Sequence, residues 1–322
     1  MIKKGVRDFG LLALALGVMF CSSSYQTSAQ TGKLSDSRAV QAAMKNVMYH
    51  YTDQVAVRIF HLQGELVPVN PESIVVFDDK NSFTLVLNSA EIAISCNALA
   101  QVLNQNVFNS ADSPLKNLSI ESRSNQLIIK GKYHLKGDVP FETIGTLSAD
   151  GNGKIRLHAE LVKAAHLPVK GLLDLLGIDL AGLINTNKVH GVTVEKDDLI
   201  IDPEQILPSP HIRGKVTAVR VRGNDIVQVF GAPQTSNFAA GQSGNYMAFR
   251  HSDLRFGKLT MHDADLIMID MDPGDPFDFY LDHYQEQLVA GYTKSTREYG
   301  LRVYTRDYNK LARRHDSGQT KK

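Results

Sequence analysis

The clearest pattern of apolar and polar positions in the chain lies between residues 154 and 161. Apolar and charged residues alternate there, which predicts a strand with one buried face and one wet face. The predicted buried face carries Ile155, Leu157, Ala159 and Leu161.

After Pro168 the apolar positions change to helical spacing and continue to Ile184. A proline is tolerated in the first turn of a helix, so we expect a helix from Pro168 to Asn185 whose apolar stripe lies across a sheet. Such a pair of elements builds either an ordinary core or a cavity for an apolar ligand.

Strand-like segments dominate the rest of the first 230 residues. The period-two pattern and the turn residues between segments predict further strands, at residues 54–62, 73–77, 82–87, 118–122, 126–135, 142–148, 192–195, 199–201, 215–222 and 225–230. Asp150–Gly153 and Arg222–Asp225 are expected to be tight hairpin turns, because Gly and Asn accept positive φ.

Three helices are predicted in addition to the Pro168 helix. One covers residues 39–48. Another begins after Ser95, a good N-cap, and carries Leu99, Val102, Leu103 and Val107 on one side. A third is expected from Pro276 to Ala290, with Asp275 as its N-cap and Gly291 as its stop, beyond strands at 246–249 and 258–270.

The first 29 residues read as a secretory signal peptide. Three basic side chains precede 13 residues from Phe9 to Cys21 that are mainly apolar, too few to span a bilayer comfortably, and Thr27 and Ala29 place small residues before a cleavage point. Cys21 leaves lipoprotein anchoring open, although Phe20 before it is not small. We expect an exported protein of the periplasm or cell envelope of a bacterium.

Cleavage after Ala29 leaves 32 basic and 33 acidic residues and one cysteine, Cys96. This balance gives no indication of nucleic-acid binding. Because an intrachain disulfide is impossible, stability must come from burial, and a composition that is 43% hydrophobic is enough for a sizeable core.

Short motifs follow one another in a fixed order between about Leu118 and Phe230: Val139-Pro140-Phe141, Gly145-Thr146-Leu147, Asp150-Gly151 before Lys154-Ile155, the Pro168-to-Ile184 segment, Ile206-Leu207-Pro208, Arg213-Gly214-Lys215-Val216 and Ile226-Val227. In these motifs the region resembles the LmeA-like family of bacterial secreted phospholipid-binding proteins. The resemblance implies an envelope protein whose curved sheet and helices hold lipid acyl chains, similar in outline to tubular lipid-binding domains, and it brings no catalytic residues.

The expected fold class is therefore α+β. We expect a β-rich, curved antiparallel sheet with a few amphipathic helices on its apolar face, plus a C-terminal α/β extension. The predicted organisation is a signal peptide (1–29), a leader and helix start (30–45), an LmeA-like lipid-binding domain (46–230), a linker (231–245), the extension (246–311), which packs on the first domain, and a disordered basic tail (312–322).

The candidate lipid-lining residues are the apolar positions of two strands and the Pro168 helix. They are Leu127, Ile129, Tyr133, Leu135, Ile155, Leu157, Leu161, Leu172, Leu173, Leu176 and Leu180. Aliphatic walls suit acyl chains, which are recognised by area and shape. The candidate headgroup or membrane residues are Lys130, Lys132, Lys136, Arg213 and Lys215, whose stripe is equally typical of a solvated sheet face.

An acidic run is the best candidate for metal or enzyme chemistry, namely Asp263, Asp265, Asp270, Asp272, Asp275 and Asp278. Its spacing matches no calcium-loop pattern, and zinc and nucleophile-elbow motifs are missing from the chain. Cys96 is interpreted as a buried small hydrophobe.

We therefore predict no catalytic residues, no metal and no cofactor. The expected partners are a phospholipid or other acylated lipid and a membrane surface bound peripherally, with no nucleic acid. An envelope hydrolase that uses residues 262–278 and a non-enzymatic adaptor are the alternatives.

Export is the first testable prediction. Sequencing the N-terminus of protein recovered from the cell envelope should give a chain that begins at Gln30. An intact Met1 terminus on cytoplasmic protein would contradict the prediction, and acyl groups on Cys21 would replace secretion with membrane anchoring.

Overall fold

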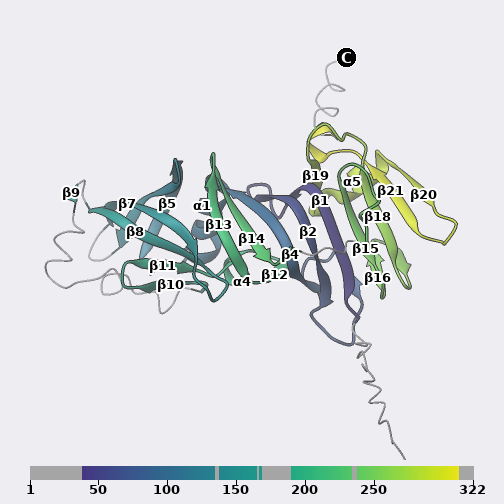
Figure 1. Cartoon of the computed structure of the whole chain (residues 1–322), viewed down its shortest axis with the longest axis horizontal. Helices are drawn as coiled ribbons and strands as arrows, with labels where there is room; N and C mark the ends of the chain where they lie inside the picture. The colour runs from purple at the N-terminus through teal and green to yellow at the C-terminus, as the bar shows by residue number, and fades with distance from the viewer. Residues whose placement is uncertain (1–37, 135–137, 165–166, 169–189, 234–237, 312–322) are drawn as a thin grey trace, which may run out of the picture. The chain divides into compact units, whose positions relative to one another are not determined.

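The computed structural model describes residues 38–134, 138–164, 167–168, 190–233 and 238–311 (Figure 1). The predicted signal peptide and basic tail, and all of the predicted Pro168 helix except Pro168, lie outside these residues. Within them the chain is a β-rich α+β protein, as predicted. No helix in these ranges is both long and apolar enough to cross a bilayer.

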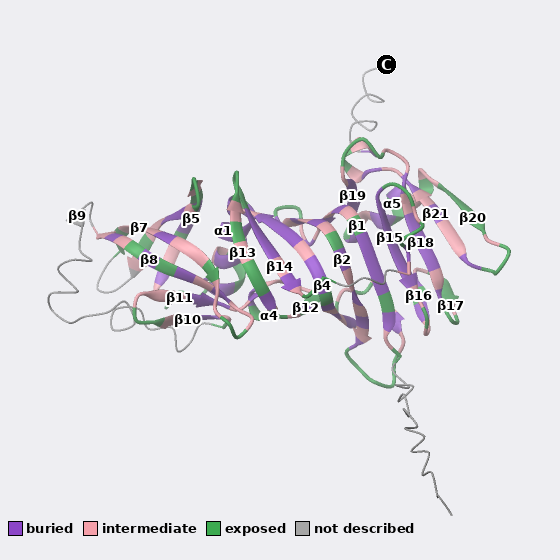
Figure 2. Cartoon of the chain, in the orientation of Figure 1, coloured by how far each residue is buried: buried purple, intermediate pink, exposed green. Residues whose placement is uncertain are grey.

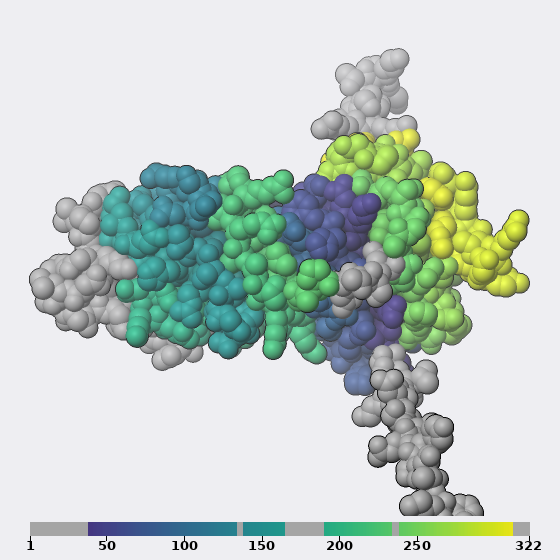
Figure 3. Space-filling model, in the orientation of Figure 1, coloured from purple at the N-terminus to yellow at the C-terminus, as the bar shows by residue number. Residues whose placement is uncertain are grey.

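The large sheet is built from the N-terminal, middle and C-terminal parts of the chain. Its strands run in the order β13 (Val216–Arg222), β14 (Asp225–Gly231), β4 (Phe83–Ser95), β2 (Ala56–Pro68), β1 (Val40–His50), β15 (Tyr246–Arg250), β18 (Asp265–Asp270), β21 (Leu301–Thr305) and β20 (Tyr292–Ser295). Two further short strands pair in parallel with strands of this sheet: β12 (His211–Arg213) pairs with β4, and β19 (Phe277–Tyr280) pairs with β1. Figure 3 shows the N-terminal strands flanked by residues 216–231 and by the C-terminal segment.

The second sheet is antiparallel throughout its described strands. Their order is β10 (Val192–Glu195), β11 (Asp198–Ile201), β8 (Ile155–Ala164), β7 (Asp138–Ala149), β6 (Gln126–His134) and β5 (Leu115–Arg123), and β9 (Leu167–Pro168) pairs with β8. A small third sheet joins β17 (Leu259–Met261), β16 (Leu254–Phe256) and β3 (Val75–Val76). Pro168 therefore lies in a strand.

The predicted helix after Ser95 is confirmed. The Ser95 hydroxyl accepts a hydrogen bond from the Ala98 amide at 3.0 Å and caps α1 (Cys96–Val102), which continues as a π-helical turn, Leu103–Val107. The apolar side of this segment is buried, and so is Cys96. The remaining described helices are short: α4 (Pro203–Ile206), a 3₁₀ turn (Leu281–His283) and α5 (Tyr284–Val289). Both predicted hairpins are also confirmed, because β7–β8 and β13–β14 are antiparallel pairs.

The helix predicted over residues 39–48, and with it the helix start within 30–45, is wrong because these residues form β1. β1 pairs along its length with β2, and on its other side with β15 and then β19. Ala42, Ala43 and Met44 favour a helix locally, but all three are buried in the middle of the sheet. Sheet pairing on both sides outweighs that local preference.

The helix predicted from Pro276 to Ala290 is also wrong in its first half. Residues 277–280 form β19, a short strand that pairs in parallel with β1 and is buried at all four positions, Asp278 included. Asp275 caps no helix there; its carboxylate pairs with Lys310 at 2.9 Å. The predicted strand at 258–270 is in fact two strands, β17 and β18.

The C-terminal segment extends the large sheet through β15, which pairs with β1 over Gln41–Lys45. Asn245, at the end of the predicted linker, is 6% exposed and bonded to Asp270 and to Asn46. Figure 2 shows buried positions on the strands from both sides of this junction.

An aromatic cluster centred on Phe77 joins these parts of the chain. The Phe77 ring lies 4.7 Å from that of Phe249 on β15, 5.1 Å from Phe256 on β16, 6.0 Å from Phe279 on β19 and 6.3 Å from Phe83 on β4, between ring centroids. The N-terminal strands and the C-terminal segment therefore share one core.

Phe77→Ala should lower the free energy of unfolding by about 3–5 kcal/mol, because it empties the centre of this cluster. Urea unfolding followed by circular dichroism should show one transition at a lower midpoint. The control is Tyr299→Ala, since Tyr299 is 98% exposed and should change stability by less than about 0.5 kcal/mol. A second transition confined to residues 246–311 would contradict the shared core.

Candidate functional site

The inner face of the second sheet is covered in part by the helical segment that begins at Cys96. Asn104 fastens this segment to β5: its side-chain NH₂ donates to the Leu118 carbonyl and its side-chain oxygen accepts from the Leu118 amide, both at 2.8 Å. These bonds fall where the register of β5 against β6 shifts between Lys116 and Ser119. The side chain therefore satisfies backbone groups at a break in the ladder and fixes the distance between helix and sheet.

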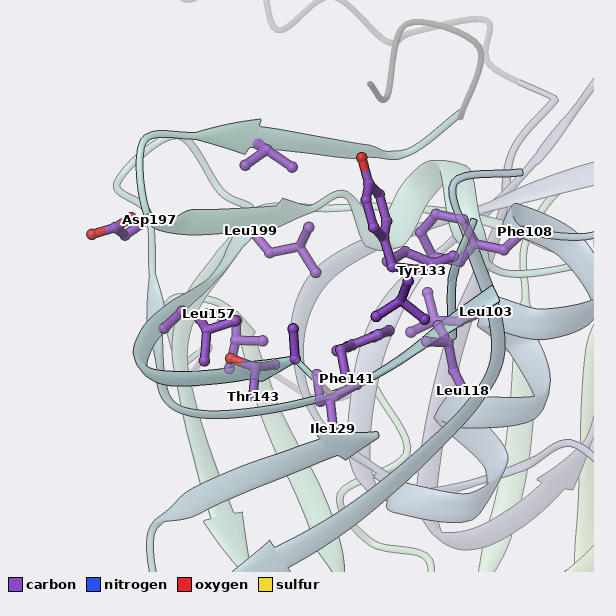
Figure 4. Close-up of a pocket in the computed structure, with 16 residues that line it drawn as sticks. Leu103, Phe108, Leu118, Ile129, Tyr133, Phe141, Thr143, Leu157, Asp197 and Leu199 are labelled. Atoms are coloured by element: carbon purple, nitrogen blue, oxygen red, sulfur yellow. The ribbon is translucent and has the colours of Figure 1, made fainter. Parts of the chain in front are cut away.

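An apolar cavity of about 140 Å³ lies between this helical segment and the sheet (Figure 4). Its walls come from the helical segment and from all strands of the second sheet except β9. The lining residues are Leu103, Phe108, Leu115, Leu118, Ile129, Tyr133, Val139, Phe141, Thr143, Leu157, Ala159, Val162, Ala164, Val194, Asp197 and Leu199.

Three of these lining residues, Tyr133, Thr143 and Asp197, carry polar side chains. The Thr143 hydroxyl donates to the Leu161 carbonyl at 3.1 Å, which leaves its methyl group for the cavity. Asp197 lies at the margin, and Figure 4 shows its carboxylate turned away from the other labelled side chains. As far as the described residues show, the interior thus offers apolar contact and no buried charge.

The cavity reaches the surface at one end. Val139 is 37% exposed, and Tyr133 and Phe141 are half-buried. Gly131 is needed beside this opening, because a Cβ there would lie 2.8 Å from Leu118 Cδ2 and 3.0 Å from Phe141 Cε1. Without a side chain on Gly131, the Phe141 ring packs over the strand and forms part of the wall.

A second, smaller cavity of about 30 Å³ continues the apolar interior toward the large sheet. It shares Leu103, Ile129 and Leu157 with the larger one and ends against Ile94 and Ile226 of β4 and β14. The apolar space therefore lies along the interface of the two sheets.

The structure brings together five of the residues predicted to line a lipid site. Ile129, Tyr133 and Leu157 line the larger cavity, and Leu127 and Ile155 the smaller one. The other predicted positions, Leu135, Leu172, Leu173, Leu176 and Leu180, lie outside the described residues.

Leu161 does not share the inner face, so the predicted alternation is wrong at that position. Gly145 pairs with Ala159 but Ile144 pairs with Leu161, which makes Glu160 the extra residue of a β-bulge. Beyond the bulge the faces exchange, and Val162 and Ala164 point into the cavity in place of Leu161.

Sequence reasoning missed the wall formed by the helical segment and β5, with Leu103, Phe108, Leu115 and Leu118, and the wall formed by Val194 and Leu199. The helical spacing from Leu99 to Val107 was a usable signal, but it predicts burial and gives no information about which sheet the helix covers.

The predicted basic residues do not form one patch. Lys130 and Lys132 lie on β6, where they pair with Glu121 at 3.2 Å and with Asp138 at 3.9 Å. Lys215 packs against Gly153, at the other end of β7 and roughly 30 Å away at about 3.3 Å per residue. Arg213 is on β12 beside the large sheet, and Lys136 lies outside the described residues.

Lys130 instead lies near Lys163, a residue that the sequence analysis did not single out. The two line a surface hollow of about 300 Å³ with Gly131, Pro140, Phe141 and Glu142. The Lys163 ammonium lies 2.8 Å from the Glu142 carboxylate, and that hydrogen bond holds the pKa of Glu142 below its usual value. Phe141 lines both the hollow and the apolar cavity, so a basic surface adjoins the cavity.

The predicted acidic run separates into two groups. Asp263 and Asp265 pair with His251, Arg250 and Arg302. Asp270 and Asp272 meet Asp307, which lies 35 residues further along the chain than Asp272, and one carboxylate oxygen of each of the three lies within 4.8 Å of the others.

Comparison of the chain with protein-family models, curated proteins and solved structures finds no match. The resemblance to the LmeA-like family stays a prediction from the sequence.

Proposed function

We propose that this protein is a cell-envelope lipid-binding or lipid-transfer protein that holds an acyl chain in the apolar cavity of the second sheet. The observation that carries the proposal is the cavity itself: about 140 Å³ of space lined by aliphatic and aromatic side chains, with a mouth at Val139. An antiparallel sheet partly covered by a helix agrees with the tubular lipid-binding outline that the family resemblance implies.

The energetics of an apolar cavity favour an apolar occupant. At about 24 cal/mol per Å³, a cavity of about 140 Å³ destabilises the empty protein by about 3 kcal/mol. Each methylene group that enters gains about 0.8 kcal/mol from leaving water. Because the walls offer no charge for a polar ligand to meet, specificity inside the cavity comes from shape and area.

The hollow outside the cavity supports a lipid ligand in particular. Lys130, Glu142 and Lys163 stand in one row across β6, β7 and β8, since each is the register partner of the next. Glu142 lies between the two lysines and Glu121 pairs with Lys130, so the row carries both signs of charge, and its lysines would meet a phosphate headgroup by exchanging a carboxylate partner for it. Phe141 lines both the hollow and the cavity, but Glu142 and Phe141 are neighbours on β7, so the charged row and the cavity lie on opposite faces of the sheet. The row would therefore contact a membrane surface while the cavity holds the acyl chain.

Filling the cavity tests the acyl-chain site. Ala159→Leu places about three methylene groups where the ligand would lie, so affinity for lipid should fall about 50-fold, at about 0.8 kcal/mol per methylene group. Native mass spectrometry of protein purified without added lipid, and transfer of a fluorescent phospholipid between vesicles, measure the loss. The folded variant should keep wild-type stability, because the added side chain occupies existing space.

The matched control is Ala90→Leu in the large sheet, where Ala90 is fully buried and lines neither cavity. Overpacking there should cost about 1–3 kcal/mol. Wild-type protein that carries and transfers no lipid, together with an Ala159→Leu variant as destabilised as Ala90→Leu, would show that the space is ordinary core.

The headgroup contact is tested by the double variant Lys130→Gln with Lys163→Gln. Binding to vesicles that contain anionic phospholipid should weaken on the order of 10-fold, since each basic side chain near a membrane contributes about 1 kcal/mol. Arg213→Gln with Lys215→Gln removes the same charge far from the cavity and should leave vesicle binding unchanged. Equal losses in both double variants would assign the effect to overall charge.

A further inference from the structure

A second cluster of polar groups lies at the far side of the large sheet, away from the lipid site in the strand order. β18 and β21 are parallel neighbours, and Asp270 pairs in register with Thr305. Because parallel strands end at the same edge, Asp270, Asp272 and Asp307 meet just where both strands stop.

Two of the three carboxylates are buried, Asp272 is partly buried, and the cluster is rich in negative charge. Asp270 is 6% exposed and Asp307 is fully buried. Lys310 lies 2.7 Å from Asp307, and Arg306 lies 3.2 Å from Asp272. The side chains of Arg306 and Lys310 are 36% and 34% exposed. Two cations beside three carboxylates leave the cluster with a net negative charge.

Two buried oxygen atoms in this place have no hydrogen-bond partner among the described residues: Thr305 Oγ1 and Asp272 Oδ2. Thr305 is 0% exposed. As the register partner of Asp270, it lies on the same face of the sheet as the Asp270 side chain. A buried hydroxyl and a buried carboxylate oxygen without partners are costly in a folded protein, which indicates that another group satisfies them.

We propose that Asp270, Asp272, Asp307 and the Thr305 hydroxyl bind a hard divalent cation, with calcium as the first choice and magnesium as the second. All the donors are oxygen atoms, and the described neighbourhood supplies no thiolate or imidazole to the cluster, a set that suits Ca²⁺ or Mg²⁺ better than zinc. The Oδ atoms of Asp270 accept hydrogen bonds from the Asp272 amide at 2.6 Å and from the Asn245 side chain at 2.7 Å, and each keeps a lone pair for a metal.

The cation would hold together elements that are distant in sequence. Asn245 ties Asp270 to the start of β15, and the Asp278 amide donates to Asp307 Oδ1 at 2.9 Å from β19. Lys310, whose side chain is 34% exposed, can leave Asp307 for solvent when the metal arrives. The site is thus independent of the lipid-binding proposal and stabilises the C-terminal part of the large sheet.

Protons compete for the same oxygen atoms. Burial raises the pKa of Asp307 to about 6, against hydrogen bonds from Lys310 and the Asp278 amide, and burial raises the pKa of Asp270 as well.

The test uses the full chain after treatment with a chelator, titrated with CaCl₂ and separately with MgCl₂. Isothermal calorimetry and thermal unfolding should show saturable binding of one cation and a rise in melting temperature. Asp272→Asn should weaken binding at least about 10-fold, as loss of a charged ligand does. Asp263→Asn is the matched control: Asp263 belongs to the same acidic run, its side chain is 87% exposed, and its loss should change nothing.

The variant Thr305→Val tests whether the Thr305 hydroxyl binds the cation or has only a structural role. Because no described residue hydrogen-bonds the hydroxyl, the variant should keep the metal-free melting temperature and lose most of the calcium-dependent increase. No saturable response to either cation at up to roughly 10 mM, above the ~10⁻³ M dissociation constants of weak calcium sites, would overturn the proposal. An unchanged response in both Asp272→Asn and Thr305→Val would overturn it equally.

Discussion

The cavity of the second sheet depends on the two hydrogen bonds between the Asn104 side chain and the backbone of Leu118. They hold the helical segment from Cys96 to Val107 at a fixed distance from β5, at the point where the β5–β6 ladder is interrupted. If the segment moved closer, Leu103 and Phe108 would fill the space against Leu118, and the interior would become a close-packed core. The two hydrogen bonds of Asn104 therefore help to keep the apolar cavity open.

The local chemistry of the chain was enough to predict most elements. Alternation of apolar residues predicted most strands between Ala56 and Gly231, although β9 and β12 were missed and β4 is longer than predicted. Turn residues predicted the hairpins at Gly151 and Gly223, and the N-cap at Ser95 predicted the start of α1. The two wrongly predicted helices share a physical cause. β1 is buried at Ala42, Ala43 and Met44 in succession and β19 at all four positions, so neither segment shows strict alternation there, and a segment without alternation is easily predicted to be a helix.

The site could be predicted only in part, because long-range pairing builds it. The strand residues Ile129 and Leu157 were predicted to line a cavity, but the bulge at Glu160 exchanges Leu161 for Val162, and nothing in the sequence of β8 marks that position. The meeting of Asp270 with Asp307 likewise depends on the parallel register of β18 and β21. Neither a bulge nor a register can be read from the periodicity of one strand.

The size of the cavity limits how a lipid can be held. Its volume of about 140 Å³ is close to that of the ~150 Å³ engineered cavity that accepts one benzene molecule, and far below the ~300–1,000 Å³ of sites that enclose whole ligands. Space of this size takes the end of one acyl chain. The proposed ligand would then place that end in the cavity and keep its headgroup outside, at the mouth near Val139. This geometry favours a protein that engages a lipid by one chain at a membrane surface, because enclosing two chains needs several times the volume that these walls provide.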